Sequence, residues 1–156
     1  MIPKQSRPSF TLIELLIVIA IIIFLAKLIL PRYTTLFAKA RQTEVVLNLS
    51  NLFAAEQAYY IQNGRFTANF KELDWQPKGY TGNQATTHNS YTYGVTNPTG
   101  AEGVSIFTGS SQTPSTALAG SQVTNDSFII KAALKTNDTA EIWSLDHTGD
   151  IKKETP

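Results

Sequence analysis

An apolar run from Phe10 to Leu30 constrains the fold of this chain more than any other feature of its sequence. Of its 21 residues, only Glu14 and Lys27 are charged. A helix rises ~1.5 Å per residue, so the run is about 30 Å long, which matches the hydrocarbon core of a bilayer. The sequence therefore predicts a membrane-spanning helix. A carboxylate in hydrocarbon costs about 2.5 kcal/mol or more, so Glu14 requires a partner.

The helical pattern continues beyond this run. Pro31 removes a backbone donor and crowds the carbonyl of Lys27, so we expect a helix kink there. Apolar residues then recur at three-, four- and seven-residue steps until Asn63-Gly64, a typical helix end. The pattern predicts one helix of roughly 53 residues, apolar all round in its first half and amphipathic in its second. The apolar positions of the second half are Val45, Leu49, Leu52, Phe53 and Tyr60, with Arg41, Gln42, Asn48 and Asn51 between them.

After the helix, residues 66–75 are expected to form a short helix or turn that packs its large apolar side chains inward. These side chains are Phe66, Phe70, Leu73 and Trp75. Residues 76–90 are rich in glycine, asparagine and threonine, which predicts a loop.

The C-terminal half has short runs of β-branched and aromatic residues, which predict strands. Short connections between them favour an antiparallel sheet with one face packed on the helix, and so an α+β fold. Asn97–Gly103 and Gly109–Ser127 read as loops, and Asn137-Asp138 and residues 146–149 as hairpin turns. The predicted strands are Tyr91–Thr96, Val104–Thr108, Phe128–Leu134, Glu141–Leu145 and Ile151–Lys153.

Composition excludes several classes of function. The formal net charge is +1, and removing Lys4 and Arg7 of the first nine residues leaves 11 basic against 12 acidic residues, or −1. This balance disfavours a specific nucleic-acid partner. Without cysteine, the chain can form neither a disulfide nor a thiolate metal site.

No group of residues suggests catalysis. His88 and His147 lie in polar loop and turn sequences, where solvated roles are usual. Asp146 and Asp150 flank the second of these, but the ligand spacing of a calcium loop is absent. We therefore expect no enzyme activity, no cofactor and no metal.

The N-terminal sequence FTLIELLIVIAIII, after a short basic leader, resembles type IV pilins and the related type II secretion pseudopilins. The resemblance is close over Phe10–Ala26, and Pro31 stands where the family has a proline. A glutamate four residues after the phenylalanine makes the motif specific. AEQAYYIQNGRFTANFKEL at 55–73 and IWSLDHTGDI at 142–151 are similar to later parts of pilins, more loosely.

This resemblance implies a fold, a site and a set of partners. A prepilin peptidase would cut between Ser9 and Phe10 and N-methylate Phe10, although pilins usually have glycine where this chain has Ser9. The membrane-held subunit would then enter a helical homo-oligomeric filament at the cell surface, driven by an assembly ATPase and a platform protein. The new amine of Phe10 would pair with Glu14 of a neighbouring subunit and set the helix register.

The resulting organisation is a leader peptide at 1–9, a transmembrane and assembly half-helix at 10–31, and a globular domain at 32–156. Within the domain we expect the amphipathic half-helix to about 62, a connecting loop at 63–90 and the sheet at 91–156. Two other readings stay open. One is a type II secretion pseudopilin or minor pilin. The other is a secreted or membrane-anchored binding domain, because Ala38-Lys39-Ala40 has the form of a signal-peptide cleavage site.

Overall fold

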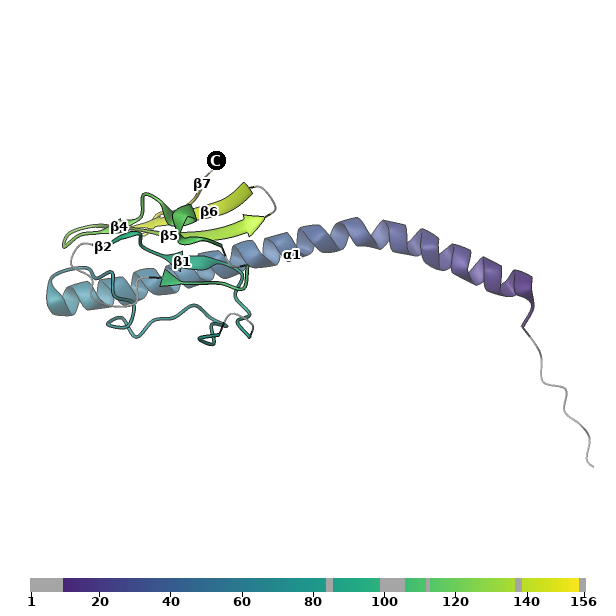
Figure 1. The fold of residues 1–156 in the computed structure, drawn as a ribbon, viewed down its shortest axis with the longest axis horizontal. Helices are drawn as coiled ribbons and strands as arrows, with labels where there is room; N and C mark the ends of the chain where they lie inside the picture. The colour runs from purple at the N-terminus through teal and green to yellow at the C-terminus, as the bar shows by residue number, and fades with distance from the viewer. Residues whose placement is uncertain (1–9, 84–85, 99–105, 112, 137–138, 155–156) are drawn as a thin grey trace, which may run out of the picture. The chain divides into compact units, whose positions relative to one another are not determined.

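The computed structural model describes residues 10–83, 86–98, 106–111, 113–136 and 139–154. The chain divides into two units, Met1–Ala40 and Arg41–Pro156. The described strands and the buried hydrophobic side chains belong to the second unit, and the first contains the N-terminal part of the long helix (Figure 1).

The helix α1 spans Leu12–Asn63, which is 52 residues. Thr11 caps its start, because its hydroxyl oxygen accepts the backbone N–H of Glu14 at 3.3 Å. Gly64 ends it in a left-handed conformation with φ of +69°, and its N–H donates to the carbonyl of Tyr60 at 2.8 Å. The single long helix and its glycine end are therefore confirmed.

The part of α1 in the first unit exposes its apolar side chains. Its most apolar window has a mean hydropathy of 3.0 and none of it is buried, so α1 is long and apolar enough to cross a bilayer. The backbone of Pro31 lies inside the helix, and the kink expected there stays a prediction. The most exposed side chains of this part include Leu12, Ile13, Phe24, Leu36 and Phe37.

The second unit contains one sheet built around β5. This strand pairs antiparallel with β6 along its length, from Ile129 opposite Asp146 to Thr136 opposite Thr139. It also pairs antiparallel with β4 and β1, while β3 pairs with β1 and β7 with β6. The strands are β1 Thr92–Gly94, β2 Asn97–Pro98, β3 Ile106–Phe107, β4 Gln122–Val123, β5 Phe128–Thr136, β6 Thr139–Asp146 and β7 Ile151–Glu154.

Two of these strands correct the sequence prediction. The two-residue strands β2 and β4 pair in parallel within segments predicted as loops. Gly109–Ser127 is also not only a polar surface loop, because it contains the 3-10 helix Ser115–Leu118 and buries Leu118 and Val123. A two-residue strand is too short for apolar and polar residues to alternate visibly, so the sequence pattern could not reveal it.

The other predicted strands are present, although the described part of Val104–Thr108 contributes only β3. The turn at 146–149 joins β6 to β7, with Gly149 at φ of +87° and the Asp146 carboxylate accepting the N–H of Thr148 at 2.9 Å. The turn predicted at Asn137-Asp138 lies outside the described residues.

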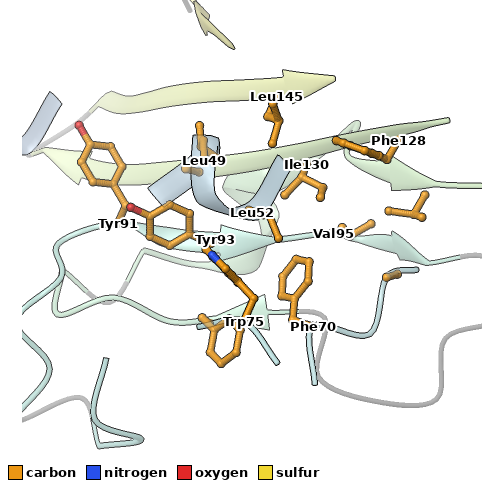
Figure 2. Close-up of a cluster of buried hydrophobic side chains, with 14 of the residues drawn as sticks. Leu49, Leu52, Phe70, Trp75, Tyr91, Tyr93, Val95, Phe128, Ile130 and Leu145 are labelled. Carbon is orange, nitrogen blue, oxygen red and sulfur yellow. The ribbon is translucent and has the colours of Figure 1, made fainter. Parts of the chain in front are cut away.

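The core lies between the amphipathic part of α1 and the sheet (Figure 2). Val45, Leu49 and Leu52 of α1 are fully buried, as the periodicity predicts. Residues 66–75 form turns and not a helix, and they bury Phe66, Phe70 and Trp75 and half-bury Leu73. The sheet contributes Tyr91, Tyr93, Val95, Phe128, Ile130 and Leu145. This packing of a long helix on a largely antiparallel sheet confirms the α+β prediction.

Candidate functional site

Phe10 precedes α1 by two residues, and Glu14 lies in the first turn of the helix. The side chain of Phe10 is 75% exposed. The Glu14 carboxylate is also exposed, and it makes no hydrogen bond or ion pair with any residue that the structure describes. A negative charge in the first turn interacts favourably with the helix dipole, but this does not replace a partner. Ser9, the other half of the predicted cleavage site, lies outside the described residues.

The surroundings of Glu14 are apolar. Ile13, Leu15 and Ile17 are between 52% and 61% exposed, and apolar side chains continue around the helix. A continuous apolar surface of this size is not stable in water and marks contact with lipid or with other proteins. The structure therefore brings a carboxylate and the residue that would carry a new N-terminus into one apolar setting.

Two polar residues on the buried face of α1 were missed by the sequence analysis, and Asn48 is the first. It was expected on the polar side of the helix, but it is 2% exposed. Its amide nitrogen donates to the hydroxyl of Tyr93 at 2.9 Å, and its amide oxygen accepts the N–H of Lys78 at 3.1 Å. Asn48 thus connects α1 to β1 and to the loop after the turns. Its spacing from Val45 and Leu52, three and four residues, is the signal that could have identified it.

Glu56 is the second. It is fully buried, its Oε2 accepts the N–H of Thr67 at 3.3 Å, and its Oε1 has no partner among the described residues. Burial raises the pKa of Glu56 to about 8; the Thr67 N–H lowers it and the charge of Glu72 raises it further. The carboxyl is therefore mostly protonated at pH 7. Its position four residues after Leu52 and seven after Leu49 places it on the buried stripe.

Glu72 anchors the turns to α1. Its Oε2 accepts the hydroxyls of Tyr59 at 2.7 Å and Thr67 at 3.0 Å, and its Oε1 accepts the amide of Asn69 at 3.2 Å. The hydrogen bond from Tyr59, followed by that from Thr67, lowers the pKa of Glu72. The pKa values of Glu56 and Glu72, which both accept hydrogen bonds from Thr67, are thus shifted in opposite directions.

A second polar cluster joins α1 to the last two strands. The Glu141 Oε1 accepts hydrogen bonds from Trp143 Nε1 at 3.0 Å and Gln42 Nε2 at 3.3 Å, and it pairs with Lys153 Nζ at 3.0 Å. Burial opposes ionisation of Glu141, but the hydrogen bonds from Lys153 and Trp143 outweigh it and lower its pKa. These contacts connect α1 to β6 and β7, which is the pattern of a structural cluster.

Replacing Glu56 with glutamine is expected to stabilise the domain at pH 7 to 8. In the unfolded chain Glu56 ionises above about pH 4.5, whereas the folded domain keeps it protonated to about pH 8, so wild-type stability falls between these values. Glutamine has no such proton, so the stability gained by Glu56→Gln should grow from pH 4.5 to pH 8. Thermal unfolding of the full chain in detergent at several pH values measures it.

Glu72→Gln is the matched control. The pKa of Glu72 is lowered, so its contribution is present above its unfolded pKa and is lost as the pH falls. This variant should therefore be less stable than wild type at pH 7 and equal to it in acid. Parallel pH profiles of stability for wild type and Glu56→Gln would show that folding does not raise the pKa of Glu56.

Comparison with known proteins gives one group of relatives. No protein-family model matches the chain. It is 34% identical over 70 residues to the type IV major pilin protein PilA of Myxococcus xanthus, which covers 45% of this chain and 32% of that protein. It is also 42% identical over 65 residues to the type IV wide pilus major component PilA4 of Thermus thermophilus. This match covers 42% of this chain and 50% of the relative.

A third relative is the type IV major pilin protein PilE1 of Neisseria gonorrhoeae, 42% identical over 63 residues, which is 40% of this chain and 38% of the relative. The matched segments thus span between about a third and a half of the relatives' own lengths. The long helix on an antiparallel sheet matches the α+β fold of type IV pilins, and over about 40% of its length the chain is similar to type IV major pilins.

Proposed function

We propose that this chain is the structural subunit of a type IV pilus-like filament, with no enzyme activity and no cofactor of its own. The observation that carries the proposal is the exposed apolar part of α1 with, at its start, a carboxylate that has no partner among the described residues. Similarity to type IV major pilins supports it. Under this proposal the surface contacts lipid before assembly and the helices of other subunits in the filament.

Before assembly, the subunit is held in the cytoplasmic membrane by residues 10–31, with the leader 1–9 on the cytosolic side and the domain 32–156 outside. A prepilin peptidase cuts after Ser9 and methylates Phe10. An assembly ATPase and a platform protein then move the subunit into the filament, where apolar helix surfaces replace lipid. The filament would serve attachment, motility or DNA uptake through the outward surface of the domain.

Cleavage supplies the partner that Glu14 requires. The amine of Phe10 is one residue before the helix cap Thr11, so it enters the membrane at nearly the depth of Glu14. Within one subunit the two groups are about one turn apart, which allows a pair before assembly. In the filament the amine of an incoming subunit pairs with Glu14 of its neighbour. Attraction between unit charges is strong and short-ranged in a medium of low dielectric, so this pair fixes the axial register.

Replacing Ser9 with lysine is expected to leave the full-length precursor in the membrane and to abolish filaments. The site before the cut favours a residue with little or no side chain, and only the cut creates the amine. Mass spectrometry of the membrane fraction measures the precursor, and electron microscopy counts the filaments. Ser9→Gly is the control and should be cut at least as completely as wild type. Filaments built from subunits that retain Met1–Ser9 would refute the role of the amine.

The first residue of the mature protein distinguishes the alternatives. A pilin or pseudopilin begins with methylated Phe10, a secreted binding domain cut after Ala40 begins with Arg41, and an anchored protein keeps Met1. Abundance in filaments sheared from the cell surface then separates a major pilin from a minor pilin or pseudopilin. A mature protein that begins at Arg41 would contradict the filament proposal.

A further inference from the structure

A hollow of about 440 Å³ opens on the second unit, and four of its lining residues belong to the turns at 66–75. Its floor is formed by the aromatic residues Phe70, Trp75, Tyr80 and Phe107. Its rim is formed by the polar residues Lys71, Asp74 and Gln76. Its volume lies in the ~300–1,000 Å³ range of small-molecule sites, which combine apolar walls with a few polar groups. All of its lining residues belong to the second unit.

The floor of this hollow is rigid because its rings pack on one another. The Phe107 ring is stacked on Phe70 with centroids 5.8 Å apart, and Trp75 and Tyr80 meet it edge to face at 5.7 Å and 4.9 Å. Trp75 also meets Phe70 edge to face at 5.5 Å, and Figure 2 shows these two side chains next to each other. The rings continue the hydrophobic core, so the floor is preformed and needs no ordering when a ligand binds.

The rim presents polar groups that the described fold does not use. The side chains of Lys71, Asp74 and Gln76 are exposed, and none makes a hydrogen bond or ion pair within the described part of the chain. Asp74 has φ of +47°, the single positive value at a non-glycine residue among those described. Glycine adopts this conformation without strain, so the chain carries a strained backbone at the position that supplies the carboxylate of the rim.

From these features we infer that the hollow binds one neutral pyranose residue of a glycan. A sugar ring has an apolar C–H face, which suits the aromatic floor, and an edge of hydroxyls, which needs both donors and acceptors. Lys71 offers donors, Asp74 offers acceptors and Gln76 offers both. The charges of Lys71 and Asp74 cancel, so the rim favours a neutral ligand over an anion or a cation. The site adds a recognition function that does not depend on assembly.

The experiment titrates the full chain in a detergent without a sugar headgroup. The Trp143→Phe background leaves Trp75 as the single indole, because the chain has two tryptophans. Probes are methyl β-glucoside, methyl β-galactoside, methyl α-mannoside and N-acetylglucosamine, with choline and inorganic phosphate as charged comparisons. We expect at least one sugar to change the Trp75 fluorescence saturably. Saturation-transfer NMR on the wild-type chain detects sugar binding independently, without the background substitution.

Asp74→Gly and Gln76→Ala test the rim. Each should weaken sugar binding about tenfold or more, as expected for loss of a hydrogen-bonding partner of a bound ligand. Asp74→Gly also relieves the backbone strain, so its melting temperature should equal or exceed that of wild type and unfolding cannot explain the loss. Asp126→Ala, an exposed change in another turn, should bind normally. Absence of sugar binding in both assays, binding unchanged in Asp74→Gly, or preference for choline or phosphate would overturn the inference.

Discussion

Glu14→Ala is expected to give a protein that still inserts in the membrane and is still cut before Phe10, but that forms almost no filaments. Alanine keeps helix propensity and the apolar character of the run, so insertion is unchanged or improved. Each assembled subunit would then contain a buried amine without its carboxylate. Removing one partner of a buried ion pair costs about 3–5 kcal/mol, so filament number should fall about 100-fold or more.

Lys27→Ala is the matched control for this variant. Lys27 is the other charged residue of the apolar run, and its long side chain can reach the outer interface, so its loss leaves the proposed pair intact. Electron microscopy counts filaments, and mass spectrometry of the membrane fraction verifies that both variants are cut. Wild-type filament number in Glu14→Ala would mean that apolar packing alone sets the register of the helices.

Leu52→Ala is expected to destabilise the second unit by about 2–5 kcal/mol. Leu52 is fully buried between α1 and the sheet, so alanine leaves a cavity in addition to the lost transfer free energy (Figure 2). For a domain of this size, the melting temperature should fall by on the order of 10 °C. Leu49→Ala should behave in the same way, because Leu49 is also fully buried.

Leu47→Ala is the control on the same helix. Its side chain is 49% exposed, so truncation should change the melting temperature by only a few degrees. Thermal unfolding of the full chain in detergent, followed by circular dichroism, compares the three variants. An unchanged melting temperature in Leu52→Ala, or equal losses in Leu47→Ala and Leu52→Ala, would contradict the packing of α1 on the sheet.

Much of the fold could be predicted because its signals are local and repeated. The helix follows from the continuous apolar run, from the apolar periodicity after it and from the end signal at Asn63-Gly64. The longer strands follow from β-branched and aromatic runs. Strands β2 and β4 could not be predicted, because each forms by pairing with a distant segment and two residues have no pattern of their own.

The buried polar residues show where periodicity was read too simply. Asn48 was assigned to the polar side by residue type and Glu56 was not considered, although the spacing of both from Val45, Leu49 and Leu52 places them on the buried stripe. Their partners, Tyr93 and Thr67, come from the sheet and the turns, so their hydrogen bonds require the three-dimensional structure.

The residues of the proposed assembly site, in contrast, are close together in the sequence. Phe10 lies two residues before the first residue of α1 and Glu14 lies in its first turn, so the sequence alone places them near each other. What it cannot supply is the partner of Glu14, because in the proposed filament that partner belongs to another subunit. The exposed apolar surface of α1 supports this reading, because such a surface is stable only when lipid or neighbouring molecules cover it.

The central claim, a filament built from this chain after cleavage, is tested most directly by mass spectrometry of surface filaments that have been sheared from cells and imaged. The account predicts that the main polypeptide of these filaments is this chain, beginning with N-methylated Phe10. Filaments that lack this chain, or in which it retains Met1–Ser9 or begins at Arg41, would contradict the account.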